Sequence, residues 1–373
     1  MDNTKPKLSL GSSTWTNISL DSIGEIRTGS TPKIKDIDNV GGPYCWVTPT
    51  DINGKEIDTT NIMLSEKGLK SARVIPANSL LVTCIASIGK NCILRSTGSC
   101  NQQINALTPN SNYDLDFLYY LLCNKEHVLH NNAGHGGMEI LNKTEFSKLV
   151  FKVPKLKEQQ KIAEFLTALD EKIRIHEQKL TKLISAKDSI LRKLFKQEIR
   201  LKDKDGSDFH PWIKVKIGDI LKVKHGKDYK NLSPGKIPVM ATSGAISYVD
   251  TALCTWPCAL IGRKGTIDKP QFMDKPFWCI DTLFYTKALG NNSPLFQYYL
   301  FQTIDWKKFN EGTGLPSLSA STIESIQCSI PMEKEQQAIA NFLRIYDEKI
   351  KICSKKIEAL KQLKKAFMQR MFV

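Results

Sequence analysis

The chain contains the same segment twice, and this internal repeat constrains its architecture more than any other feature. Residues 153–173 read VPKLKEQQKIAEFLTALDEKI and residues 330–350 read IPMEKEQQAIANFLRIYDEKI, at a fixed offset of 177 positions. Matches this dense indicate a duplication, which predicts two units of similar fold. Such a molecule would have pseudo-twofold symmetry, which would suit a partner with matching twofold symmetry.

Fainter echoes extend the repeat upstream. WTNISL at residues 15–20 resembles WIKVKI at 212–217, and FLYYLL at 117–122 resembles FQYYLF at 296–301. Between these anchors the copies differ almost completely, and WVTPTDI at 46–52 has no recognisable counterpart in the second copy. A shared frame with unlike contents predicts two modules that are built alike and bind different things.

Each repeat continues as a long helix with one narrow apolar stripe. The inward positions alternate between spacings of four and three residues, which is the period of a coiled-coil seam. Lys187 and Lys364 interrupt the two stripes at matching positions, where a lysine lowers stability but fixes register and strand number. We expect the two helices to pack against each other in antiparallel orientation. The predicted seam consists of Ile162, Leu166, Leu169, Ile173, His176, Leu180, Leu183, Lys187, Ile190 and Leu194 in the first copy, and of Ile339, Leu343, Tyr346, Ile350, Cys353, Ile357, Leu360, Lys364, Phe367 and Met371 in the second.

Prolines mark where each globular part ends and its helix begins, at Pro154 and Pro331. The predicted segments are a first globular domain at 1–152, a central helix at 153–202, a second globular domain at 203–330 and a distal helix at 331–373. The pattern predicts strands at 79–84, 92–95 and 104–107 before a helix at 116–130, and strands at 259–262 and 279–285 before a helix at 294–307. The expected fold class is mixed α/β, with two similar globular domains joined by two long antiparallel coiled-coil helices in a pseudo-twofold arrangement.

The charge balance narrows the class of partner. The chain of 373 residues carries a formal net charge of +15, which favours a polyanion, either nucleic acid or an anionic membrane surface. The basic residues are spread along the chain, which argues against a disordered basic arm. No apolar run reaches the ~18 residues that span a membrane, and the first residues lack the apolar stretch of a signal peptide. We expect a cytoplasmic protein with no membrane partner.

The ten cysteines do not predict a metal centre. None forms a C-x-x-C pair, so zinc ligation is poorly supported. Cys123, His127 and His130 could share one helix face, but such a group is more often part of core and surface than a metal site. In a cytosolic protein we expect the cysteines to be reduced and mostly buried.

Short motifs follow one another in a distinctive order. The strongest are the two P-x-x-x-E-Q-Q-x-I-A segments that begin at Pro154 and Pro331. The others are WVTPTDI at 46–52, ASIGK at 86–90 and NQQI at 101–104 in the first copy, and IPVMATSG at 237–244, LIGRKGT at 260–266 and DTLF at 281–284 in the second. In this order the whole chain resembles the specificity (S) subunits of type I restriction–modification systems.

The resemblance implies a DNA-binding subunit without catalytic activity. Residues 1–152 and 203–330 would be DNA target-recognition domains, which would together read a split, asymmetric target in double-stranded DNA. The partners that it implies are two methyltransferase (M) subunits and, after them, the restriction (R) subunits. It implies no cofactor for this chain.

A search for catalytic motifs agrees with that expectation. The sequence has no G-x-x-x-x-G-K-[ST] phosphate loop, no H-E-x-x-H and no [ND]-P-P-Y segment. We therefore predict no catalytic residue. Three alternatives stay open: a fused nuclease or methyltransferase, a structural coiled-coil protein without a nucleic-acid role, and a membrane-surface protein. The missing motifs disfavour the first, the basic charge and the motifs disfavour the second, and the narrow seam disfavours the third.

Candidate DNA contacts lie in loops with closely spaced hydrogen-bond donors, because phosphate contacts give affinity and base-edge contacts give sequence. Gln102 and Gln103 suit adenine edges, and Arg263 is the best candidate for a guanine contact. The alternative for each residue is an ordinary surface side chain, and for the two glutamines a place in a strand that faces the core. The candidates are Thr31, Lys33, Lys35, Lys90, Asn91, Gln102 and Gln103 in the first copy, and His225, Lys227, Tyr229, Lys230, Arg263 and Lys264 in the second.

Overall fold

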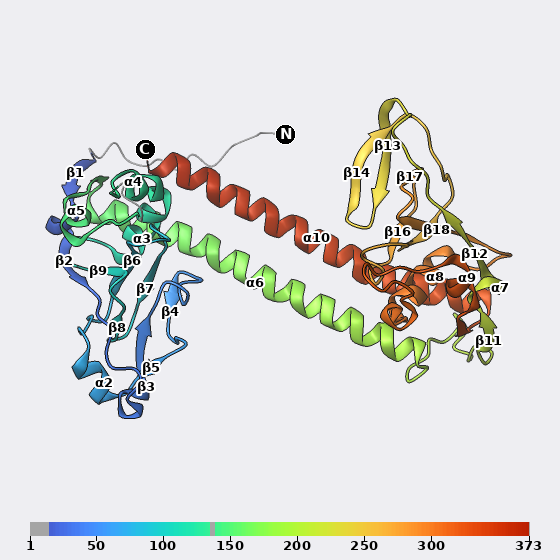
Figure 1. Cartoon of the computed structure of the whole chain (residues 1–373), viewed down its shortest axis with the longest axis horizontal. Coiled ribbons are helices and arrows are strands. Elements are labelled where there is room, and N and C mark those ends of the chain that lie inside the picture. Colours follow the sequence, from blue (N-terminus) through green and yellow to red (C-terminus); the bar gives the residue numbers. More distant parts are fainter. Residues whose placement is uncertain (1–14, 135–138, 373) are drawn as a thin grey trace. The chain divides into compact units, whose positions relative to one another are not determined.

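The computed structural model describes residues 15–134 and 139–372 (Figure 1). The chain divides into a first unit, Met1–His176 with Lys356–Val373, and a second unit, Glu177–Lys355. Each unit therefore holds one mixed α/β domain together with one stretch of each long helix. This division differs from the predicted segments, which assigned each helix to a part of its own.

The two long helices are α6, Leu156–Phe195, and α10, Glu333–Met371 (Figure 1). Each begins two residues after its proline, and each is shorter than the predicted segment. All seam positions predicted from the heptad pattern are buried or half-buried. The start of α6 packs on the end of α10 in the first unit, where the rings of Phe165 and Phe367 lie 4.8 Å apart. In the second unit Leu194, near the end of α6, shares a core with Ile339 of α10. Each unit thus shows the antiparallel pairing that the sequence predicted.

The first unit is built on a five-stranded sheet in the order β2-β9-β6-β7-β4. A three-stranded sheet, β5-β3-β8, and a two-stranded pair, β1-β10, complete its β structure within the described residues. The strands are β1 Thr16–Ser19, β2 Gly24–Thr28, β3 Val40–Val47, β4 Glu56–Ile57, β5 Met63–Leu64, β6 Ser79–Thr83, β7 Asn91–Leu94, β8 Ser99–Cys100, β9 Ile104–Pro109 and β10 Val150–Val153. The helices are α1 Leu20–Ile23, η1 Ile37–Asn39, α2 Glu66–Ser71, α3 Leu115–Asn124, α4 Glu126–Asn131 and α5 Lys143–Lys148.

The second unit repeats this plan with a four-stranded sheet, β12-β18-β15-β16, a three-stranded sheet, β14-β13-β17, and the pair β11-β19. The strands are β11 Ile213–Lys216, β12 Leu221–His225, β13 Pro234–Ala241, β14 Gly244–Val249, β15 Cys258–Gly262, β16 Gln271–Met273, β17 Trp278–Cys279, β18 Leu283–Ala288 and β19 Gln327–Ile330. The helices are α7 Ile217–Ile220, α8 Pro294–Thr303, η2 Trp306–Phe309 and α9 Ala320–Ser325.

Three features of the structure differ from what the sequence pattern predicted. The helix expected at 116–130 is two helices, α3 and α4, which are separated at Lys125. The strand expected at 279–285 is interrupted at 280–282, between β17 and β18. The segment expected to be peculiar to the first copy, 46–52, begins in β3, which has a topological counterpart in β13. Both strands pair in parallel with a two-residue strand, β8 and β17 respectively.

One glutamine of each repeated E-Q-Q segment ties the long helix to its domain. The Gln159 Oε1 accepts the backbone N–H of Asp114 at 2.8 Å, and its Nε2 donates to the Pro154 carbonyl at 2.9 Å. The Gln336 side chain repeats both bonds, with the N–H of Ser293 at 3.0 Å and the Pro331 carbonyl at 3.0 Å. These bonds satisfy backbone groups at the prolines and at the N-caps of α3 and α8.

Replacing the buried Gln336 with alanine is expected to lower the unfolding free energy by about 1–3 kcal/mol, because a buried backbone N–H would lose its partner. The neighbouring Gln337 is exposed and provides the matched control, for which we expect a change within about 0.5 kcal/mol. Urea unfolding followed by circular dichroism measures both. Equal effects of the two substitutions would contradict this role for Gln336.

The cysteines are all free thiols, and most of them are buried, as expected. Burial raises the pKa of the Cys100 thiol to about 12 and that of Cys84 to about 11. These two thiols therefore stay protonated and unreactive near neutral pH.

Candidate nucleic-acid interface

Three loops meet in each unit at the ends of its central strands. In the first unit they are residues 29–31, 84–90 and 101–103, and in the second 226–230, 263–266 and 280–282. We call each set the three-loop cluster. The same backbone hydrogen bonds hold both clusters together, so the two can be compared residue by residue.

In both units the first loop, 29–31 or 226–230, is hydrogen-bonded to the two residues that flank the turn 101–103 or 280–282. The Gly29 N–H donates to Ile104 O at 3.0 Å and the Ser30 N–H to Cys100 O at 2.8 Å. In the second unit Gly226 donates to Leu283 O at 3.1 Å and Lys227 to Cys279 O at 2.8 Å. A side chain cannot replace either glycine, because a Cβ on Gly29 or Gly226 would lie 2.1 or 2.0 Å from a backbone carbonyl oxygen. This close approach explains the glycine that both copies share.

The remaining loop is joined by an equally repeated bond. The Cys84 N–H donates to Gln103 O and the Arg263 N–H to Thr282 O, both at 2.8 Å. Cys84 and Arg263 are therefore structural equivalents, and the turn 101–103 is the equivalent of 280–282. The frame is the same, whereas the side chains that it carries are different.

In the first cluster Thr31 and Gln102 lie together. The Thr31 hydroxyl donates to Gln102 Oε1, and both residues are exposed. Gln103 is half-buried, and its Oε1 accepts from the Asn101 side chain at 2.9 Å. Both glutamines belong to the turn that precedes β9, so neither lies in a strand facing the core. Gln102 is the one that stays available to a ligand.

The other candidates of the first unit fall into two groups. Lys33, Lys35 and Lys90 are exposed. Asn91 is the first residue of β7 and is buried, and its amide donates to the Gly89 carbonyl at 3.2 Å. A buried and bonded amide does not suit a DNA contact, so the three lysines remain candidates and Asn91 does not.

In the second unit His225, Arg263 and Lys264 line one cavity of about 550 Å³, together with Glu311 and hydroxyls of the segment 317–321. Arg263 is half-buried, and its Nη1 donates to the Asp281 carbonyl at 3.2 Å. The His225 ring meets Phe284 edge to face at 5.0 Å. Three residues that the sequence predicted as DNA contacts thus line one cavity.

Lys227, Tyr229 and Lys230 follow His225 in the same loop. Both lysines are exposed and Tyr229 is half-buried. The Lys227 carbonyl accepts the indole N–H of Trp278 at 2.8 Å, which fixes the course of this loop beside β17. The loop therefore presents two exposed cations shortly after His225, which lines the cavity that contains Arg263.

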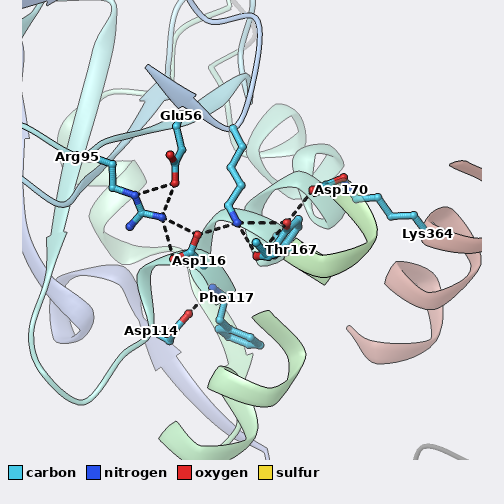
Figure 2. A network of polar contacts seen from close by, with 10 residues as sticks. Glu56, Arg95, Asp114, Asp116, Phe117, Thr167, Asp170 and Lys364 are labelled. Carbon is cyan, nitrogen blue, oxygen red and sulfur yellow. Dashed lines mark hydrogen bonds and ion pairs between the residues drawn. The ribbon is translucent and has the colours of Figure 1, made fainter. Parts of the chain in front are cut away.

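The seam lysines have partners that sequence reasoning missed. In the first unit Lys364 Nζ lies 2.6 Å from Asp170 Oδ1, and the Tyr120 hydroxyl donates to Asp170 Oδ2 at 2.7 Å (Figure 2). The Lys364 ammonium also lies over the Tyr120 ring, 5.2 Å from the ring centroid. We call this arrangement of aspartate, lysine and tyrosine the seam triad.

The second unit contains the same seam triad. Lys187 Nζ lies 2.6 Å from Asp347 Oδ1, and the Tyr299 hydroxyl donates to Asp347 Oδ2 at 2.6 Å. Burial raises the pKa of both tyrosines, so each hydroxyl stays a donor at neutral pH. The aspartates were already visible among the identical residues of the repeat, but a heptad pattern weighs only apolar positions.

The first unit adds a polar network that extends its triad. Lys55 Nζ donates to Thr167 Oγ1 and pairs with Asp116 Oδ1, both at 2.7 Å, and Arg95 joins Asp116 to Glu56 (Figure 2). These groups line a cavity of about 610 Å³ beside the exposed face of α6. The network brings the domain and the helix into one polar assembly.

Two further observations concern the part of the chain that the structure describes. It contains no cluster of three or more histidine, cysteine or acidic side chains arranged to hold a metal ion. Within residues 15–134 and 139–372, no helix combines the length and the apolar character that crossing a membrane requires.

Comparison with known families gives two matches along the chain. The profile of the type I restriction modification DNA specificity domain matches residues 12–184 and again residues 210–362. Each match contains one globular domain and the greater part of the long helix that follows it.

Individual relatives agree with this result. The type I restriction enzyme MjaIX specificity subunit of Methanocaldococcus jannaschii is 25% identical over 96% of this chain and 92% of that protein. The MjaVIII specificity subunit of the same organism is 25% identical over 75% and 73%. Among solved structures, the S subunit of a type I restriction–modification system from M. genitalium has a TM-score of 0.70 at 18% identity, covering 99% of both chains.

Proposed function

The chain belongs to the family of type I restriction–modification DNA specificity subunits, and from that premise we propose that its two units read two unlike half-sites of one DNA target. The observation that carries this proposal is the three-loop cluster. The backbone bonds are the same in both units, whereas Gln102 stands where the second unit has Asp281, and Cys84 where it has Arg263. Equal frames with different side chains suit one split, asymmetric target in double-stranded DNA.

Exchanging residues 1–150 for those of a relative is expected to change one half-site and leave the other unchanged. The exchanged part carries the whole first three-loop cluster and none of the second. Selection of bound sequences from a random DNA pool measures both half-sites at once. A simultaneous change in both would contradict the assignment of one half-site to each unit.

We also propose that two copies of one methyltransferase (M) subunit dock on the repeated helices, with restriction (R) subunits joining later. The support is a set of exposed positions that are identical in both copies. Gln160, Glu171 and Ile175 on α6 match Gln337, Glu348 and Ile352 on α10. Gln160 and Glu171 are eleven residues apart, about three helical turns, and Ile175 follows about one turn later, so each set lies on one helix face. Ile175 is 50% exposed and Ile352 66% exposed, which suits apolar anchors of an interface.

Substitution of either isoleucine tests the two-copy proposal. Ile352→Glu is expected to remove one bound M subunit, Ile175→Glu the other, and the double variant both, because a buried carboxylate opposes docking. Leu363→Glu is the matched control, since Leu363 is 44% exposed on α10 but has alanine at the equivalent position of α6. Sedimentation of the complexes gives the stoichiometry. A wild-type complex with a single M subunit would refute the proposal.

We assign the chain no catalytic step. Its relatives are named as specificity subunits, and a solved structure that covers 96% of this chain, with a TM-score of 0.57, comes from work on complex assembly of a type I restriction–modification system. Methylation and cleavage would therefore be supplied by the partners that the chain directs to its target.

A further inference from the structure

We propose that the turn of the three-loop cluster reads an A·T pair in the first unit and a G·C pair in the second, through Gln102 and Arg263. The inference rests on the proposed function, since it assumes that each unit reads one half-site. It goes further by assigning a class of base pair to each turn and one side chain to each reading.

The two side chains lie at equivalent turns of the two units, although they come from different loops. Gln102 belongs to the turn 101–103 itself. Arg263 comes from the neighbouring loop, and its Nη1 bonds at 3.2 Å to the carbonyl of Asp281, the residue equivalent to Gln102. The guanidinium of the second unit thus lies against the backbone of the turn residue whose equivalent in the first unit is Gln102.

Gln102 has the chemistry that recognition of adenine requires. A carboxamide pairs with adenine in the major groove by accepting from N6 and donating to N7. The Thr31 hydroxyl donates to Gln102 Oε1, which distinguishes the two ends of the amide and leaves Nε2 of this exposed side chain as a donor. The Oε1 atom retains a second lone pair for the adenine amino group. Thr31 is in this account a positioning residue.

Arg263 has the corresponding features for guanine. A guanidinium pairs with guanine O6 and N7 through two parallel N–H bonds. Its bond to the Asp281 carbonyl uses one Nη1 hydrogen, so the other donors stay available. The side chain is half-buried in its hollow, unlike the exposed Lys264 beside it, and a restrained planar fork suits a base edge better than a phosphate. The exposed Asp281 would suit the amino group of cytosine in the same pair.

The test is selection from a random DNA pool by the complex of the full chain with its methyltransferase subunit. Arg263→Ala is expected to reduce preference at one G·C position of one half-site by roughly ten- to a hundredfold. Gln102→Ala is expected to do the same at one A·T position of the other half-site. Lys264→Ala and Lys33→Ala are the matched controls, and both are expected to weaken binding at every sequence alike and to reduce its salt dependence.

Further variants separate reading from folding. Thr31→Val retains Gln102 and is expected to weaken the same A·T preference by a smaller factor, and Arg263→Lys is expected to retain part of the G·C preference. All variants should keep the thermal unfolding midpoint of the wild type.

The outcomes are distinguishable. Uniform weakening without a change of preference at any position, or a loss at the opposite class of base pair, would overturn the inference and leave the two half-sites intact. If the wild-type complex selected no split target at all, the proposed function itself would fail.

Discussion

Replacing Asp347 with alanine is expected to destabilise the second unit by about 2–3 kcal/mol. The substitution leaves the Lys187 ammonium, whose side chain is only 10% exposed, without its carboxylate, and it removes the acceptor of the Tyr299 hydroxyl. Loss of one partner of a buried ion pair costs about 3–5 kcal/mol. Asp347 is 35% exposed, which lets water replace part of the lost interaction. Chemical unfolding of the full chain, followed through the tryptophans, measures the effect.

A double substitution distinguishes the effect of the ion pair on stability from its effect on helix register. Lys187→Met with Asp347→Leu replaces the pair by apolar side chains of similar size, and we expect the unfolding free energy to stay the same or to increase. The role of the ion pair would then be to set the register of α6 against α10, as a polar residue does at a coiled-coil seam. An Asp347→Ala variant as stable as the wild type would contradict this account of the triad.

Seven residues added to both long helices, after Ser185 in α6 and after Lys349 in α10, are expected to lengthen the spacer between half-sites while leaving their sequences unchanged. Both insertion points lie between the two seam triads in sequence, so both triads stay intact. A heptad preserves the phase of the seam. It adds about 10 Å of helix, or about three base pairs at 3.4 Å each.

Insertion of a single residue at the same two places is the control. It rotates the following residues by about 100° and takes them out of the seam, so we expect assembly to fail. The spacer is read by selection from random DNA, and assembly by sedimentation. A heptad variant that remains active with the original spacing would show that the helices do not set the distance.

The sequence predicted the duplicated parts of the fold well, because identical residues and the heptad period are local signals. Pro154 and Pro331 lie two residues before the two long helices, and the seam positions are buried or half-buried. The sequence pattern did not predict the break at Lys125 or the interruption at 280–282, because the polar residues found there also occur within amphipathic helices and half-buried strands. The equivalence of β3 and β13 was missed because parallel pairing with a two-residue strand leaves almost no trace in sequence.

The candidate site was predictable only in part. Loop composition selected His225, Arg263 and Lys264, which share one cavity, but it also selected Asn91, which is buried. Polarity alone does not distinguish an amide that completes a turn from one that faces a ligand. The pairing of Thr31 with Gln102 depends on two loops 71 positions apart in sequence, and only the fold brings them together.

The most direct test of the central claim is to sequence methylated sites after co-expression of this chain with its methyltransferase subunit in a host without methylation of its own. Two unlike units on one chain predict a single target made of two different half-sites separated by a spacer of fixed length and variable sequence. A continuous target, or two half-sites that are inverted copies of each other, would contradict the account.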